Sequence, residues 1–326
     1  MMPPKNKPKN LAEVMRTALS SVQSGVVCVV VRDATLMLHA RMTFQSHMLS
    51  AASIADVPIA ATETLTALYG SGSHDADIAE VLVRHNGDAS QRIDELKIIR
   101  LDNCRVFKPL SNEGVHVTLQ NLKDYGCVAA EQSIVGMPRD GMIDAINRLD
   151  AGSRKQNGIV LLFLLCSANS DATWLRQHCD EVFIVDKCEP GPGASIAYSI
   201  TALSLESQHA NGIGRTMYEI SYQGSDWTST SSVFIAAKAE DRAIWFARRN
   251  GEYLETIADW MGVDKSTVKR RQDNLPLSTD VNADVDPPDE WHDLWFPFLG
   301  WNDAEDESDD DDDADGESSD RPKRIG

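Results

Sequence analysis

The sequence predicts an α/β fold with a mostly parallel sheet and flanking helices, followed by a small all-α domain and a disordered acidic tail. Short apolar runs, which are typical of buried strands, recur at 26–31, 96–106, 127–135, 159–168, 181–185 and 217–222. Amphipathic helical stretches lie between several of these runs, at 75–83, 115–125, 139–149 and 171–178. Strands that are separated by helices need crossover connections, which make neighbouring strands parallel.

The end of this α/β region has a different pattern. Segments 196–205 and 216–222 follow each other without a helical stretch, which favours an antiparallel hairpin at one edge of the sheet. Further along, Pro276 and the paired prolines at 287–288 end the regular pattern, because proline lacks a backbone donor. We therefore expect three parts, namely an α/β core (1–235), a helical domain (236–277) and an aromatic and acidic tail (278–326).

Charge is distributed unevenly along the chain. The 326 residues carry a net charge of −19, but residues 280–320 hold eighteen Asp and Glu and no Lys or Arg. Residues 321–326 add three basic side chains, so residues 1–279 carry only −4. The acidity is a property of the tail and does not exclude a polyanionic partner for the folded part.

The sequence indicates a cytoplasmic protein. Its first ten residues are polar and basic, unlike an export signal, and its longest apolar run, 159–166, is far shorter than the roughly 20 residues of a membrane-spanning helix. The six cysteines form no Cys-x-x-Cys pair, which predicts buried free thiols in a reducing compartment. His178, Cys179 and Cys188 lack the spacing of a common zinc site, so we expect no metal.

The stretch 252–275 has the pattern of two short helices joined by a tight turn. Apolar residues three and four apart give the first helix one buried face, at Leu254, Ile257, Ala258 and Met261. Gly262 can take the left-handed conformation that ends this helix, and the side chain of Asp264 can cap the next helix. The pattern therefore predicts a helix-turn-helix.

The second helix begins at Lys265 and has a basic exposed face. Val268 alone on its early turns points back to the first helix, and four of the seven residues at 265–271 are cationic. The side chains left to meet phosphates and base edges are Lys265, Ser266, Thr267, Lys269, Arg270 and Arg271.

This segment resembles the helix-turn-helix of site-specific resolvases and of many small bacterial and phage regulators, over 238–277. The shared features are the small Ala258, the turn residue Gly262, the apolar Val263 and a Ser-Thr-Val run followed by basic residues. The resemblance implies that the second helix recognises DNA. Arg271 stands where the family usually has an apolar residue, so we expect the end of this helix to be frayed or turned outward. The alternative is a helical hairpin that caps the core without touching DNA.

The order of elements in the second half of the core is similar to the late part of RecA-like ATPase cores of plasmid and phage replication proteins. However, the chain contains no G-x-x-x-x-G-K-[ST] phosphate loop, and its glycine-rich loops at 70–74 and 191–193 are typical of turns. Asp102 ends a strand but binds no metal by itself. We therefore assign no catalytic residue and no cofactor.

The tail carries an aromatic cluster followed by an acidic run. Five aromatic residues lie within 291–301, at Trp291, Trp295, Phe296, Phe298 and Trp301. They either fold back onto the core or dock in a groove of a protein partner. The following twelve acids in 303–320 either keep the chain soluble or compete with DNA for the basic helix.

From these features we expect a non-enzymatic, bacterial or mobile-element regulator that binds double-stranded DNA through its helix-turn-helix. The α/β core would then provide a homo-oligomer contact or a partner surface. Two alternatives stay open. One is a divergent RecA-like NTPase involved in plasmid or phage replication or partition, and the other is an adaptor that binds protein through 291–301.

Overall fold

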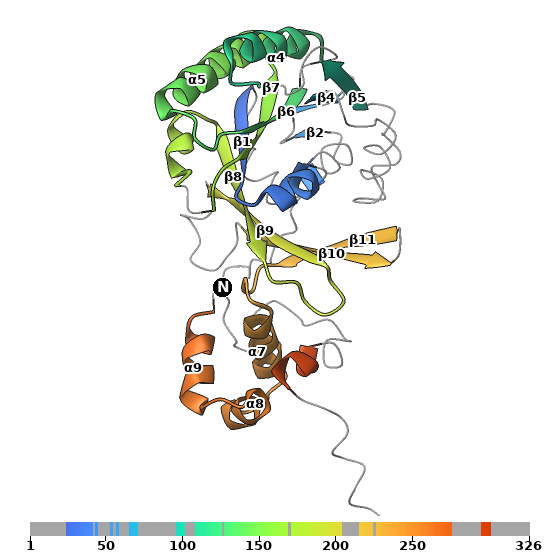
Figure 1. Cartoon of the computed structure of the whole chain (residues 1–326), viewed down its shortest axis with the longest axis vertical. Helices are drawn as coiled ribbons and strands as arrows, with labels where there is room; N and C mark the ends of the chain where they lie inside the picture. The colour runs from blue at the N-terminus through green and yellow to red at the C-terminus, as the bar shows by residue number, and fades with distance from the viewer. Residues whose placement is uncertain are drawn as a thin grey trace, which may run out of the picture.

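The computed structural model describes residues 24–41, 43–44, 53–54, 57–58, 65–70, 96–101, 108–125, 127–168, 171–203, 215–223, 226–275 and 295–300. It has an α/β core with a group of three helices beyond one end of the sheet (Figure 1). The helix predicted at 75–83 and the residue Asp102 lie outside the described residues.

The main sheet has nine strands in the order β11-β10-β9-β8-β1-β7-β6-β4-β5. Its parallel part comprises β5 (Leu96–Leu101), β4 (Leu65–Gly70), β6 (Cys127–Ser133), β7 (Ile159–Leu165), β1 (Gly25–Val31) and β8 (Glu181–Cys188). The prediction of a mostly parallel sheet is confirmed. β1 lies between β7 and β8, so the chain leaves β1 towards one side of the sheet and later returns to its other side.

The antiparallel part of the sheet is larger than predicted. β9 (Ile196–Ala202) and β10 (Arg215–Gln223) pair as the expected hairpin. The edge, however, is β11 (Asp226–Val233), which was not predicted because its sequence, DWTSTSSV, contains no apolar run. β4 was not predicted either, and two short strands, β2 (Ser53–Ile54) and β3 (Val57–Pro58), form a separate pair.

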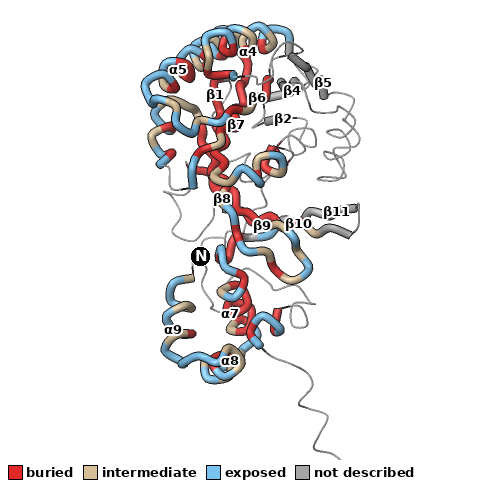
Figure 2. Tube along the Cα trace, in the orientation of Figure 1, coloured by how far each residue is buried: buried red, intermediate tan, exposed pale blue. Residues whose placement is uncertain are grey.

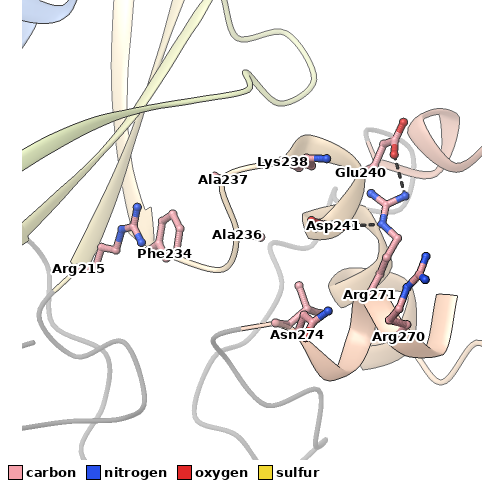
Figure 3. Close-up of a pocket in the computed structure, with 11 residues that line it drawn as sticks. Arg215, Phe234, Ala236, Ala237, Lys238, Glu240, Asp241, Arg270, Arg271 and Asn274 are labelled. Carbon is pink, nitrogen blue, oxygen red and sulfur yellow. Dashed lines mark hydrogen bonds and ion pairs between the residues drawn. The ribbon is translucent and has the colours of Figure 1, made fainter. Parts of the chain in front are cut away.

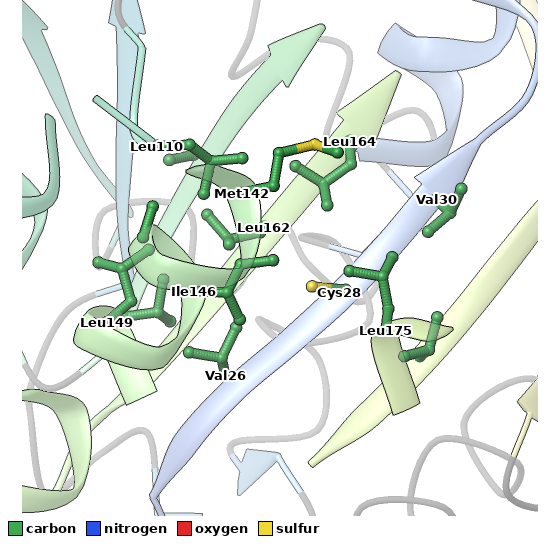
Figure 4. Close-up of a cluster of buried hydrophobic side chains, with 14 of the residues drawn as sticks. Val26, Cys28, Val30, Leu110, Met142, Ile146, Leu149, Leu162, Leu164 and Leu175 are labelled. Carbon is green, nitrogen blue, oxygen red and sulfur yellow. The ribbon is translucent and has the colours of Figure 1, made fainter. Parts of the chain in front are cut away.

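Two helices cover one face of the parallel strands. α4 (Asn112–Tyr125) and α5 (Arg139–Gln156) bury their apolar side chains against alternate residues of β1 and β7, as Figure 4 shows for Ile146 and Leu149 of α5 near Val26. All seven residues of β1 are buried, so both faces of this central strand are covered (Figure 2). On the opposite face, the ring of Phe44 packs edge-on against those of Phe163 and Phe183, at 5.9 and 5.1 Å between centroids.

The helix ends differ from those predicted. α5 continues seven residues beyond the predicted end at 149, and the Arg154 guanidinium at its end pairs with Asp150 and Asp180. The stretch 171–178 forms only a 3₁₀ helix, η4 (Thr173–Gln177), at whose start the Asp171 carboxylate accepts from the Thr173 amide at 2.9 Å. Within the described ranges, no helix has the length and apolar composition needed to cross a membrane.

The packing of α5 on the sheet predicts a large difference between two leucines. Leu149 is fully buried, whereas Leu38 is 51 % exposed. We expect Leu149→Ala to lower the free energy of unfolding by about 2–5 kcal/mol, because it leaves a cavity under α5. Leu38→Ala, the matched control, should change it by less than about 0.5 kcal/mol. Urea unfolding measures the unfolding free energy of both variants. Equal losses of stability would contradict the packing of α5 on the sheet.

Candidate nucleic-acid interface

The three helices below the sheet in Figure 1 form a small unit with its own apolar core. They are α7 (Ala239–Arg249), α8 (Leu254–Met261) and α9 (Lys265–Asp273). Ile257 and Ala258 of α8 and Val268 of α9 are buried against α7, and Leu254 and Met261 are partly buried beside them. Val268 therefore points inward, and the polar side of α9 is left at the surface.

The turn between α8 and α9 depends on a glycine. Gly262 has φ 61° and ψ 36°, a left-handed conformation, and its amide donates to the Asp259 carbonyl at 3.1 Å. The expected cap by the Asp264 side chain is wrong, because this carboxylate accepts no hydrogen bond from the first turn of α9. Instead, the amides of Thr267 and Val268 donate to the Asp264 carbonyl oxygen, at 2.8 and 3.3 Å. The backbone thus begins the helix without help from the acidic side chain.

Four of the six side chains predicted to contact DNA are exposed on α9. Lys265, Ser266, Lys269 and Arg270 are exposed and Thr267 is half-buried. The Lys265 ammonium donates to the Glu255 carboxylate, which lowers the pKa of Glu255, and Lys269 pairs with Asp273 at 2.6 Å. Ion pairs between exposed side chains are weak, so a phosphate group could replace either carboxylate.

Arg271 lies differently from the other five. It was expected to be at a frayed or outward-turned end of the helix, but α9 continues to Asp273 and the Arg271 side chain is only 22 % exposed. Its guanidinium turns towards α7, where it meets Asp241 at 2.6 Å and Glu240 at 2.8 Å (Figure 3). The Arg271 guanidinium therefore joins α9 to α7, through a partly buried ion pair with Asp241 and a more exposed one with Glu240.

A second arginine fixes the three helices to the sheet. Arg242 is 2 % exposed and donates to the carbonyl oxygens of Ala236 and Glu189, at 3.0 and 2.6 Å, and to a carboxylate oxygen of Glu219 at 3.3 Å. The same Glu219 oxygen accepts from the Gly191 amide at 2.7 Å. Arg242 was not among the predicted site residues. Helical spacing in the sequence could have identified it as a buried residue. Arg242 lies three residues after Ala239 and four before Phe246, on the buried face of α7.

Part of the aromatic cluster folds back onto the helices. η5 (Phe296–Leu299) packs on α7 and α8, with Trp295, Phe296 and Leu299 buried and the ring of Phe296 4.9 Å from that of Trp260. The expectation of a disordered tail is therefore wrong for 295–300, where aromatic side chains gain enough burial to order the chain. Phe298 is 39 % exposed, and Trp291 and Trp301 lie outside the described residues.

The carboxyl end of β1 is where a parallel sheet of this kind would accept a phosphate group. Here the chain continues as Arg32 and Asp33. The Asp33 carboxylate accepts from the amide and hydroxyl of Thr35, at 2.8 and 2.6 Å, and these bonds lower its pKa. Lys187 pairs with Asp33 at 3.1 Å and Arg32 with Asp186 at 3.1 Å. An acidic side chain thus occupies the start of the following helical segment, in the position where a phosphate loop would have an anion.

The cysteines of the described ranges are free thiols. Cys28, Cys127, Cys166 and Cys188 are buried, Cys179 is half-buried, and burial raises the pKa of Cys127 to about 12. The Sγ atom of Cys179 lies 3.1 Å from that of Cys28. In the part of the chain that the structure describes, no three His, Cys, Asp or Glu side chains come together as metal ligands.

Comparisons with known proteins show a distant structural likeness. The sequence matches no known protein family and no curated protein. Among solved structures, the chain is similar to a KaiC-like protein of the hyperthermophilic archaeon Pyrococcus horikoshii, with 8 % identity and a TM-score of 0.39 over 63 % of this chain and 89 % of the other.

The turn geometry leads to a prediction with a matched control. A Cβ added at Gly262 would contact no atom within 4 Å, so the cost of Gly262→Ala comes from its positive φ alone and should be about 1–2 kcal/mol in unfolding free energy. Gly141 lies within α5, where there is space for an added Cβ. Gly141→Ala should therefore stabilise the protein by about 0.5–1 kcal/mol in unfolding free energy. Thermal unfolding of both variants measures this. An unchanged stability of Gly262→Ala would contradict the left-handed conformation of the turn.

Proposed function

We propose that the protein binds double-stranded DNA through the exposed side of α9 and acts as a non-enzymatic regulator. The observation that carries the proposal is the orientation of α9. Its single apolar side chain, Val268, is buried against α7 and α8, while Lys265, Lys269 and Arg270 are exposed. A helix that serves only as a cap has no need for three cations on its solvent side, whereas the DNA backbone attracts them.

The packing of the unit also supports DNA recognition. α8 and α9 are short, joined by a tight turn and held by α7, so α9 lies on a rigid base. The hydroxyls of Ser266 and Thr267 lie on the first turn of α9, where they can reach phosphates or base edges alongside the cations. We leave Arg271 out of this contact surface, because its guanidinium is bound to α7.

The α/β core has a separate task in this proposal. Regulators bind duplex DNA commonly as dimers whose symmetry matches the two half-sites. The core would supply the contact between two copies or a surface for a protein partner, in a cytoplasmic setting. Phe298, at 39 % exposure, is the one described member of the aromatic cluster that is available for such a partner.

The proposal predicts a change in the salt dependence of DNA binding. Replacing Lys265, Lys269 and Arg270 together by Gln removes three cations from α9. The loss of each phosphate contact should flatten the slope of log affinity against log salt by about 0.9, so we expect a total change of about 2.7. Fluorescence anisotropy with a labelled random duplex measures the slope between about 50 and 200 mM salt.

The matched control changes the same charge elsewhere. Lys123 of α4, Lys155 of α5 and Lys108 are exposed and lie far from α9 in the sequence, so replacing all three by Gln should leave the slope unchanged. Equal slopes for wild type, the α9 variant and the control would refute DNA binding by α9. If the salt slope flattened equally in both variants, DNA binding would depend on the overall charge of the protein and not on the cations of α9.

A divergent RecA-like NTPase is the second candidate. The observation in its favour is the arrangement of β1 between β7 and β8, with a helical segment directly after β1. In open α/β sheets, such a change of direction is the usual place for a nucleotide. The segment Arg32–Asp33–Ala34–Thr35 offers neither a glycine loop nor a lysine, and Asp33 repels phosphate.

The residues after β1 therefore predict no nucleotide binding. Titration calorimetry with millimolar Mg-ATP should give no saturable heat, and phosphate release should stay at background with or without duplex DNA, because Asp33 already fills the anion position. A saturable binding signal, or phosphate release above background, would move the NTPase candidate into first place.

A further inference from the structure

A cavity of about 520 Å³ lies between the sheet and the three helices. Figure 3 shows Arg215 and Phe234 on the sheet side and Arg270, Arg271 and Asn274 on the side of α9. Lys238, the last residue before α7, lines the same cavity. Four of its lining side chains are cationic, and only two, Glu240 and Asp241, are acidic.

Both acids in the lining pair with the same cation. Glu240 and Asp241 contact Arg271, so these three side chains together carry one negative charge, and the four cations of the lining still exceed the two acids by two. Lys238 and Arg270 are exposed, and within the described ranges neither lies within 4.0 Å of a carboxylate. The cavity therefore presents two cationic side chains without an acidic partner in this part of the chain.

Arg215 adds a third cation that is held in position. Its guanidinium stacks on the ring of Phe234 at 3.7 Å and donates to the Ser199 hydroxyl at 2.9 Å, with Asp186 at 3.9 Å. Planar stacking and two different polar partners fix the direction of this side chain. A phosphate entering the cavity would meet a guanidinium that needs little ordering.

We infer that this cavity binds a backbone phosphate of the same duplex that α9 contacts, with Lys238 and Arg270 as its ligands and Arg215 behind them. The inference rests on the proposed function. Continuity supports it, because Arg270 belongs both to the exposed side of α9 and to the lining of the cavity. The DNA-binding surface then extends from α9 across the linker onto β10, and Lys238 becomes a contact that the sequence pattern of the second helix does not include.

The test compares three single variants by the same salt titration. Lys238→Gln should flatten the salt slope by about 0.9, equivalent to one phosphate contact, and lower affinity several-fold at low salt. Lys238→Arg keeps the charge and should restore the wild-type slope. Lys155→Gln removes the same charge at the end of α5, which lies at the end of the molecule away from the three helices (Figure 1), and should change nothing. Lys238 makes no side-chain cap on α7, so its replacement leaves the helix start intact.

The outcomes separate this inference from the proposed function. If the wild-type protein binds duplex and the α9 variant has a flatter slope, but Lys238→Gln behaves like Lys155→Gln, the cavity is not a DNA contact and the proposed function stands. If wild type does not bind duplex, both fail. Tripolyphosphate serves as a separate probe. Saturable binding that Lys238→Gln weakens, with an unchanged duplex slope, would overturn the inference and assign the cavity to a small phosphorylated ligand.

Discussion

The buried guanidinium of Arg242 determines how the two parts of the molecule sit together. A charge with 2 % exposure is tolerable only where acceptors surround it, and here they come from the β8–β9 connection, β10 and the linker before α7. Removing one partner of such a group typically costs about 3–5 kcal/mol. The position of α9, and hence any surface that it forms with the sheet, depends on this one side chain staying paired.

The basic helix carries its own acidic neighbours. Glu255 and Asp273 pair with Lys265 and Lys269, and in the proposed complex with DNA these pairs would have to open. Each ion pair is weak because it is exposed. Together, however, the two pairs lower the affinity of α9 for any anion that carries a single charge, because such an anion has to displace a carboxylate. A duplex, which offers a regular row of phosphates, gains more from the exchange than a small anion does. Selectivity for an extended polyanion can therefore arise close to α9 itself.

Elements with a strong hydrophobic period could be predicted from the sequence, and those without one could not. Five of the six parallel strands were recognisable because fully buried strands need continuous apolar runs, such as IVLLFLL in β7, whereas β4 was missed. β11 could not be predicted because an edge strand can be polar throughout. Around α9, spacing predicted the inward position of Val268 and the glycine turn. The inward position of Arg271 and the ion pair of Lys265 could not be predicted, since their partners lie on α7 and α8.

The packing of 295–300 on the three helices limits where the chain can be divided into fragments. The apolar core of the three helices includes Trp295, Phe296 and Leu299, which come from beyond the proline-rich stretch. A fragment that ends at 277 would expose the surfaces of α7 and α8 that these side chains cover, and would be prone to self-association. Gly191 adds a constraint from the other side, because a Cβ there would lie 2.7 Å from the Trp295 ring. The helical unit thus extends to residue 300, and it also needs the sheet to cover part of its surface.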